Sequence, residues 1–200
     1  GQARFRTKQV WQWLYQHLVT DFSQMTNLSK SLRGSLEEAF TFYQPVVLAQ
    51  QTSLDGEARK DLLEFEDGET VEVVLMRYID RRGACISSQI GCSMNCRFCA
   101  TGQMGYTRNL SSGEIVAQAL HLARELKASD NRLTNIVFMG MGEPFLNYDN
   151  TLDAARRLIH PDGFGMGQRR VTISTVGIVP GIKRFAKAGT QINLAISLHA

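Results

Sequence analysis

Residues 91–102, GCSMNCRFCATG, carry three cysteines at the spacing CxxxCxxC. Cys92, Cys96 and Cys99 place three thiolates on one tight loop, and the glycines at the two ends of the stretch let its backbone wrap closely around a bound group. Three thiolates fill three corners of a four-iron cluster and leave one iron open. The stretch therefore predicts a [4Fe-4S] cluster with one open iron.

Two other metal sites also use closely spaced cysteines. A structural zinc site requires a fourth Cys or His at matching spacing, and a ferredoxin fills all four corners, often with a Cys-Pro run that is absent here. The open cluster is the interpretation that the spacing favours. An open iron can be chelated by the amino and carboxylate groups of S-adenosylmethionine (SAM), and one electron then cleaves SAM to a deoxyadenosyl radical.

Composition places the chain among folded proteins of a reducing compartment. Of its 200 residues, 44% are apolar, and the net charge of +3 is compatible with a polyanionic partner without requiring one. No apolar run approaches the roughly 18 residues of a membrane span, and the first residues contain no signal-peptide core. All four cysteines lie between Cys85 and Cys99, which indicates metal or redox chemistry rather than a disulfide framework. We expect a cytoplasmic protein with no membrane partner.

Three segments with different sequence patterns follow one another along the chain. Residues 1–42 have apolar positions at helical spacing and predict a small helical module. Residues 43–82 contain short β-rich stretches separated by LDGE, EDGE and DRRG, and a further β-rich stretch, ACISSQI, follows them. This pattern predicts a β meander that leads into a larger domain. Residues 83–200 alternate strand and helix, with helices expected at 112–126, 150–159 and 180–188 and strands at 135–139, 170–175 and 191–198.

Strict alternation of helix and strand predicts an α/β fold whose parallel sheet is either doubly wound or a partial (β/α) barrel. Ligands of such sheets bind at the carboxyl ends of the strands. We therefore expect the residues after each strand to converge on one pocket, namely those from 87 onward, 140–144, 174–177 and 197–199. Because an open barrel that stops after a strand exposes an apolar edge, we expect the sequence to be part of a longer enzyme.

Six longer stretches add to the cysteine run. They are FRTKQVWQWLYQ (5–16), VEVVLMRY (71–78), RGACISSQIGCSMNCRFCATGQMGYTRNL (82–110), VFMGMGEPFLN (137–147), VTISTVGIVPGI (171–182) and LAISLHA (194–200). Together they resemble the radical SAM adenine C2-methyltransferases of 23S rRNA and tRNA, which have a C8-methylating, antibiotic-resistance relative. The resemblance covers essentially the whole chain and implies a partial (β/α) radical SAM barrel.

The resemblance implies roles for individual residues. The cluster ligands would be Cys92, Cys96 and Cys99, and the SAM contacts would be Gly142, Glu143, Ser174, Ser197, Leu198 and His199. By pattern alone, GMGEP also fits a tight βα turn, Ser174 a helix N-cap and His199 a structural histidine. The return of Ser after successive strands favours a shared SAM pocket.

The same resemblance implies a covalent relay, in which a methylated cysteine delivers its carbon to adenine at the peptidyl transferase centre of 23S rRNA and beside the anticodon of tRNA. Glu72 would accept the ring proton, and Cys85 would release the product by forming a disulfide bond. By pattern alone, Cys85 fits a buried packing residue and Glu72 the solvated face of a strand. The family's methyl-carrying cysteine, and an Asn that contacts SAM, lie downstream of these 200 residues.

The partners implied are 23S rRNA, tRNA and an electron donor such as flavodoxin, and we expect a monomer. The cations and aromatics of the first helix fit RNA docking, although aromatics at helical spacing also fit a core; they are Arg4, Phe5, Arg6, Lys8, Trp11, Trp13 and Tyr15. Further candidate RNA contacts are Arg81, Arg82 and Arg108. The alternatives are C8 methylation, a radical SAM enzyme with a non-RNA substrate, and a zinc or cluster protein that only binds nucleic acid.

Overall fold

The computed structural model describes residues 3–198. Its elements, in chain order, are α1 (Arg4–Tyr15), η1 (Phe22–Gln24), α2 (Lys30–Ala39), β1 (Val46–Thr52), β2 (Ala58–Glu64), β3 (Thr70–Arg77), β4 (Arg82–Cys85), β5 (Gln89–Gly91), α3 (Ala100–Gln103), β6 (Tyr106–Asn109), α4 (Ser112–Ala128), β7 (Asn135–Phe138), η2 (Pro144–Asn147), α5 (Tyr148–Ile159), η3 (Gln168–Arg170), β8 (Val171–Thr175), α6 (Val179–Ala186) and β9 (Asn193–Ile196). No helix in this described part is both long and apolar enough to cross a membrane.

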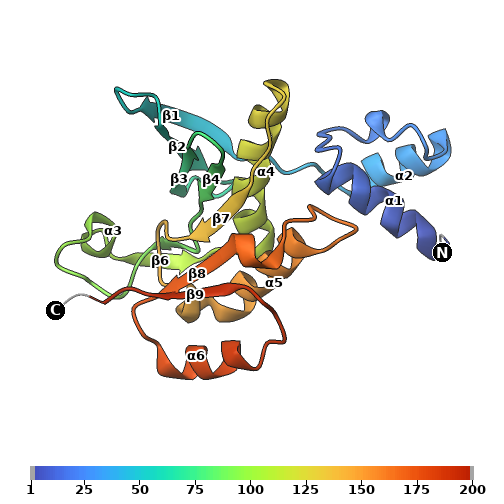
Figure 1. Ribbon diagram of the computed structural model, residues 1–200. Coiled ribbons are helices and arrows are strands. Elements are labelled where there is room, and N and C mark those ends of the chain that lie inside the picture. Colours follow the sequence, from blue (N-terminus) through green and yellow to red (C-terminus); the bar gives the residue numbers. More distant parts are fainter. Residues whose placement is uncertain (1–2, 199–200) are drawn as a thin grey trace.

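Seven strands form one mixed sheet in the order β1-β2-β3-β4-β7-β8-β9. The meander β1 to β4 is antiparallel, whereas β4, β7, β8 and β9 are parallel neighbours. Because the parallel strands lie side by side in chain order, right-handed crossovers place α4, α5 and α6 on the same face of the sheet. The predicted α/β fold is confirmed, and the arrangement is the partial barrel rather than the doubly wound alternative (Figure 1).

The two faces of the parallel strands differ in burial. The side chains that point toward the helices are at most 1% exposed; they include Ala84, Ile136, Phe138, Val171 and Ile173. Successive side chains of a strand point to opposite faces, so Cys85, Val137 and Thr172 lie on the other face. That second face is only partly covered and is therefore the one that can receive a ligand.

A buried carboxylate ties the meander to α4. Asp61 of β2 is fully buried, and its oxygens accept hydrogen bonds from Arg59 at 2.8 Å and from His121 of α4 at 2.9 Å. The Arg59 guanidinium also pairs with Glu125 of α4. Because every charge in this buried group has a partner, the network holds β2 in one position against the helix.

The N-terminal helices have a small hydrophobic cluster of their own around Met25 and Leu28. Figure 1 shows them on the side of the molecule opposite to α3. Two cations of α4 hold the end of α1: Arg124 donates to the carbonyl of Leu18 at 3.1 Å and Lys127 to that of His17 at 2.8 Å. The helix that covers the sheet is therefore one of the attachments of the module to the rest of the fold.

The β-rich stretch ACISSQI is divided between two strands. The strand breaks between Cys85, where β4 ends, and Gln89, where β5 begins. At Ser87 the side chain of Gln118 from α4 replaces a strand partner, because its Oε1 accepts from the Ser87 N–H at 2.8 Å and its Nε2 donates to the Ser87 carbonyl at 3.0 Å. The chain leaves the sheet there and enters a separate hairpin.

Candidate functional site

The three cysteines of the CxxxCxxC run lie on residues 92–105, here called the cysteine loop, which joins β5 and β6 of a separate two-stranded hairpin. The neck of the loop is closed by the N–H of Cys92, which donates to the carbonyl of Gly105 at 2.8 Å. Inside the loop the N–H of Cys99 donates to the carbonyl of Cys96 at 3.0 Å. All three thiols are free and only partly exposed.

Two glycines allow this loop to close. Gly91 has φ +69°, and a Cβ there would lie 2.0 Å from the carbonyl oxygen of Gly105. A Cβ on Gly102 would lie 2.9 Å from the backbone nitrogen of Cys96. The backbone is therefore wrapped more tightly than any residue with a side chain permits.

The cysteine loop fits an iron–sulfur cluster better than a single ion. Among residues 3–198, the only group whose ligand atoms all lie within 4.8 Å of one another is Asp61, His121 and Glu125. The sulfurs of Cys92, Cys96 and Cys99 therefore lack the close convergence that one zinc ion, about 2.3 Å from each sulfur, requires. Burial raises the pKa of the Cys92 thiol, and the nearby charges of Cys96, Cys99 and Glu143 raise it further.

Residues 140–144 follow β7 and form what we call the GMGEP loop. Gly142 has φ +96°, and a Cβ there would lie 2.5 Å from the Cβ of Gln89. The Gln89 side chain accepts from the N–H of Glu143 at 2.8 Å and donates to the Asn109 side chain at 2.7 Å. Gln89 thus fastens the GMGEP loop to the hairpin that carries the cysteines.

Glu143 joins two loops at the carboxyl edge of the sheet. Its side chain is only 3% exposed, Oε1 accepts from the N–H of Phe145 at 2.9 Å, and Oε2 accepts from the N–H of Val176, after β8, at 2.8 Å. The family resemblance implies that this carboxylate is a SAM contact. In the structure each oxygen already accepts a backbone hydrogen bond, so the carboxylate fixes the position of both loops.

Ser174 and Ser197 are brought together from β8 and the end of β9. Their hydroxyl oxygens are 3.0 Å apart. The N-cap alternative for Ser174 is wrong, because α6 begins at Val179, and Thr175 is the side chain that accepts hydrogen bonds from the turn before it. Leu198 is exposed, and His199 lies outside the described residues.

Glu72 and Cys85 lie on the same, partly covered face of the sheet. Cys85 is directly opposite Val74 of β3, and Glu72 is two residues before Val74. The backbone carbonyl of Glu72 accepts from the Ser87 hydroxyl at 2.7 Å, and its N–H contacts the Met141 sulfur at 3.3 Å. Glu72 is therefore fixed beside the GMGEP loop.

The Cys85 thiol is not activated by its surroundings. Burial raises its pKa to about 11, against a smaller opposing effect of a hydrogen bond with the backbone of Met139. The thiolate is the reactive form of cysteine, so Cys85 is mostly unreactive at neutral pH. No cysteine in the described chain forms a disulfide.

Sequence reasoning missed the buried polar side chains that hold these loops together. Gln89 and Gln118 are two of them, and Asn147 is a third: its Nδ2 donates to the carbonyls of Ser88 at 2.8 Å and Leu110 at 2.7 Å. One signal was present, because three polar residues in a row, Ser-Ser-Gln at 87–89, interrupt an otherwise apolar strand. Buried polar groups need partners, and here those partners are the loops of the site.

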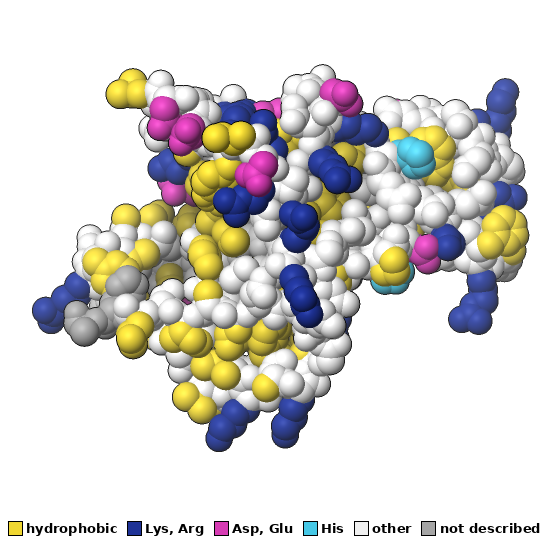
Figure 2. Space-filling view, in the orientation of Figure 1, with side chains coloured by type: hydrophobic (Ala, Val, Ile, Leu, Met, Phe, Trp, Pro, Cys, Tyr) yellow, Lys and Arg dark blue, Asp and Glu magenta, His cyan; other side chains and the backbone are white. Residues whose placement is uncertain are grey.

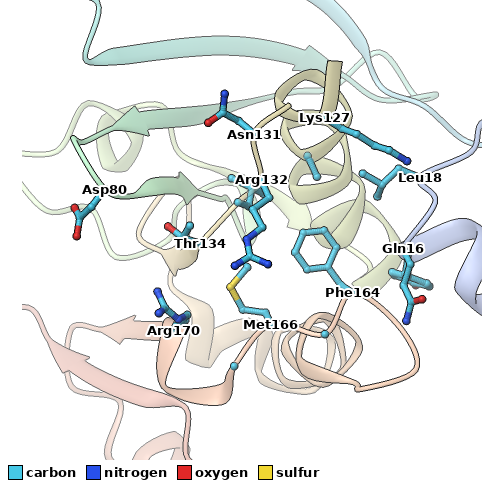
Figure 3. A pocket seen from close by; sticks show the side chains of 15 residues that line it. Gln16, Leu18, Asp80, Lys127, Asn131, Arg132, Thr134, Phe164, Met166 and Arg170 are labelled. Carbon is cyan, nitrogen blue, oxygen red and sulfur yellow. The ribbon is translucent and has the colours of Figure 1, made fainter. Parts of the chain in front are cut away.

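A basic hollow lies at the opposite edge of the sheet. Its volume is about 550 Å³, and Figure 3 shows side chains from the N-terminal module, from the chain before β7 and from the chain before β8 around it. Three of them are cations, Lys127, Arg132 and Arg170, and Figure 2 shows several Lys and Arg side chains on this side of the molecule. Since this is the amino edge of the parallel strands, it is not the edge where this architecture carries its chemistry.

The first helix only partly matches the expected RNA-binding pattern. Trp11 packs against Tyr15, with ring centroids 4.4 Å apart, and against His160, so the core alternative holds for these two aromatics. Lys8 is paired with Asp162 at 2.7 Å. The exposed part of the pattern is Arg4 and Phe5 of the first turn, and the guanidinium of the half-buried Arg6 lies over the Phe5 ring.

The site combines a loop of three free thiols with a glycine-rich turn at the carboxyl edge of a partial barrel. Comparison with known proteins identifies the class of protein that has such a site. Residues 86–200 match the family model of the radical SAM superfamily, and the chain belongs to that superfamily. Membership implies an iron–sulfur cluster and SAM. Residues 1–41 match a second model, described as the ribosomal RNA large subunit methyltransferase N-terminal domain.

Individual relatives agree with both matches. A crystal structure of a radical SAM methyltransferase from Sphaerobacter thermophilus is 45% identical with a TM-score of 0.92, covering 98% of this chain and 58% of that one. A probable dual-specificity RNA methyltransferase RlmN from Chloroflexus aurantiacus is 49% identical over all of this chain and 54% of its own length. The RlmN of Marinobacter nauticus is 45% identical over all of this chain and 54% of its own length. The chain spans about half the length of these curated relatives.

Proposed function

We propose that the protein methylates carbon 2 of an adenosine in 23S rRNA and in tRNA by a radical SAM reaction that passes through a methylated cysteine. One observation carries the proposal: the GMGEP loop lies beside Glu72 at the face that carries Cys85, and Gln89 fastens that loop to the hairpin of the cysteine loop. Relatives named as dual-specificity RNA methyltransferases, 43–49% identical over the whole chain, support it.

In this proposal the cysteine loop and the strand ends hold the cofactors. Cys92, Cys96 and Cys99 would ligate a [4Fe-4S] cluster whose fourth iron is open to SAM, and the bound cluster supplies the electron that cleaves SAM. The proposed SAM contacts are Gly142, Glu143, Ser174, Ser197, Leu198 and His199. Because both Glu143 carboxylate oxygens accept backbone hydrogen bonds, we assign to Glu143 the shaping of the SAM site as well as contact with the ligand.

Carbon 2 of adenine explains why a radical is needed. It lies between two ring nitrogens and is electron-poor, so it does not attack the methyl group of SAM as an amine would. After carbon transfer, Glu72 takes the ring proton. The Cys85 sulfur then bonds to the sulfur of the methyl-carrying cysteine as the carbon–sulfur bond breaks, and the released carbon takes up a proton to become the methyl group of the product. In the family pattern the methyl-carrying cysteine lies downstream of residue 200. The proposed disulfide forms during turnover.

We further propose that residues 1–42 form an RNA-docking module, 43–82 a connecting segment and 83–200 the catalytic core. The exposed residues of the first turn of α1, Arg4 and Phe5, are the part of the module available to RNA, and Arg6 beside them is half-buried. A flavodoxin-type donor supplies the electron, and the protein acts as a cytoplasmic monomer.

Cys85→Ala in the full-length protein tests the thiol relay. The variant is expected to cleave SAM but not to turn over, and to accumulate a covalent protein–RNA adduct that is detected by denaturing electrophoresis with labelled RNA. Cys92→Ala is the matched control and should give neither SAM cleavage nor adduct, because it removes a proposed cluster ligand. Full activity of Cys85→Ala would overturn the relay.

A further inference from the structure

We propose that Lys60 is a positioning residue for the proton transfer: it holds one oxygen of the Glu72 carboxylate so that the other is free to take the proton from carbon 2 of adenine. The inference rests on the proposed function, because it concerns one step of that reaction. It adds Lys60 to the residues on which the proton transfer depends.

The register of the sheet places Lys60 in line with the reaction face. Lys60 of β2 is directly opposite Val74 of β3, and Val74 is directly opposite Cys85 of β4. Side chains directly opposite one another in neighbouring strands share a face of the sheet. Lys60 therefore belongs to the face that carries Glu72 and Cys85, whereas its neighbour Asp61 points to α4 and is buried.

A single ion pair controls the Glu72 side chain. Lys60 Nζ lies 2.8 Å from Glu72 Oε1 and so holds the carboxylate from one side. The backbone on both sides of Glu72 is already held, through Ser87 at the carbonyl and Met141 at the N–H. Lys60 thus restrains the one part of Glu72 that the backbone contacts leave free to rotate.

The pair does little for the stability of the fold. The two side chains are 41% and 44% exposed, and ion pairs exposed to this degree contribute about 0–1 kcal/mol. The exposure also leaves the Glu72 carboxylate within reach of an incoming base. A pair that stabilises the fold weakly but fixes the direction of an acceptor oxygen is suited to orienting a reacting group.

The step itself is a simple proton transfer. In the adduct between the methyl-derived carbon and adenine, the C2–H bond breaks, its proton passes to Glu72 Oε2, and the bonding electron pair stays in the ring. The Lys60 ammonium keeps its proton throughout and donates to Oε1, so Lys60 acts through Glu72 and not on the substrate.

The test compares Lys60→Met and Lys60→Arg in the reconstituted full-length protein, with RNA carrying hydrogen or deuterium at carbon 2 of the target adenosine. Lys60→Met is expected to lower turnover at saturating RNA by about 10-fold, less than the ~10²–10⁴-fold that general acid–base catalysis contributes, because Lys60 acts only through Glu72. It should also increase the isotope effect, because proton removal becomes slower relative to the other steps. Lys60→Arg should restore most of the rate, and Lys183→Met, an exposed lysine of α6, should match the wild type.

Two further measurements separate this role from other functions of a lysine. In the cluster-free protein, Lys60→Met should change the RNA affinity by less than about twofold. If Lys60 contacted a phosphate instead, the variant would bind RNA more weakly and its binding would depend less steeply on salt. Adding Lys60→Met to Glu72→Gln should cause no further loss, because two residues that act through one step are not additive.

Weaker RNA binding with an unchanged isotope effect would make Lys60 a phosphate contact and overturn the inference, as would wild-type rates in Lys60→Met. Lys60→Gln serves if the Met variant does not fold. If the wild-type protein forms no 2-methyladenosine, the proposed function fails and the inference fails with it. If the wild-type protein forms 2-methyladenosine and the Lys60 variants form it at the same rate, the inference fails and the proposed function stands.

Discussion

The carboxylate of Glu143 accepts a hydrogen bond from the backbone N–H of Val176 at 2.8 Å, which links the loops that follow β7 and β8. The same side chain accepts from Phe145 in its own loop. Two neighbouring strand ends are thus held at a fixed separation by one buried side chain, and the proposed SAM site is built across that separation.

Glu143→Gln is expected to destabilise the protein and to weaken SAM binding. A glutamine amide has one acceptor oxygen, so one of the two backbone N–H groups loses its partner, at a cost of about 1–3 kcal/mol. Urea denaturation of the wild type and the variant measures this cost. Glu37→Gln, at an exposed position of α2, is the control, and an unchanged midpoint for Glu143→Gln would contradict the bridging role.

Asp61→Asn is expected to reduce the free energy of unfolding at pH 7 by about 3 kcal/mol, the low end of the cost of breaking a buried pair, because Glu125 still pairs with Arg59. Burial opposes ionisation of Asp61, but hydrogen bonds from His121 and Arg59 outweigh it and hold the pKa of the carboxyl below its ordinary value. A lowered pKa stabilises the fold above the unfolded value of about 3.9 and loses that contribution as pH falls through the folded value.

The difference between the wild type and Asp61→Asn should therefore persist from neutral pH to about pH 5 and shrink below about pH 4. Urea unfolding at several pH values measures it. Asp153→Asn removes a more exposed ion pair with Arg157 and should cost less than about 1 kcal/mol. Equal costs for the two variants would show that the Asp61 network is not a special anchor.

Gly102→Ala is expected to impair cluster assembly, because a Cβ there would lie 2.9 Å from the backbone nitrogen of Cys96 and force the cysteine loop open. Iron and sulfide content after anaerobic reconstitution is the measurement. Gly34→Ala is the matched control, since a Cβ there meets no atom within 4 Å. Full iron loading of Gly102→Ala would refute the tight-loop explanation.

The resolving step should accelerate with pH. The pKa of Cys85 is raised to about 11. As long as the pH stays below that value, the thiolate fraction of Cys85 increases about tenfold for each unit by which the pH rises. The decay of the protein–RNA adduct in a single turnover should therefore be about 100-fold faster at pH 9 than at pH 7. A rate independent of pH would mean that bound RNA or a neighbouring group takes the Cys85 proton.

Much of the fold could be predicted from local patterns. The helix expected at 112–126 is observed as Ser112–Ala128, because its start is set by a capping box in which Ser111 and Glu114 exchange hydrogen bonds. The side chain that pairs with the backbone after β4 could not be predicted, because it belongs to Gln118, a residue of a later helix that contacts Ser87.

The site divides in the same way. The spacing of Cys92, Cys96 and Cys99 is a local property of the sequence, and the structure places the three on one loop. The pairing of Glu143 with Val176, and that of Lys60 with Glu72, depend on the order of strands and on sheet register. Such contacts become visible only once the strands are assembled.

Mass spectrometry of nucleosides from RNA treated with the full-length protein, SAM and a reductant tests the central claim most directly. The account predicts 2-methyladenosine in 23S rRNA and in tRNA, formed together with deoxyadenosine and only when Cys92, Cys96 and Cys99 are intact. The appearance of 8-methyladenosine instead, or SAM cleavage with RNA left unmodified, would contradict it.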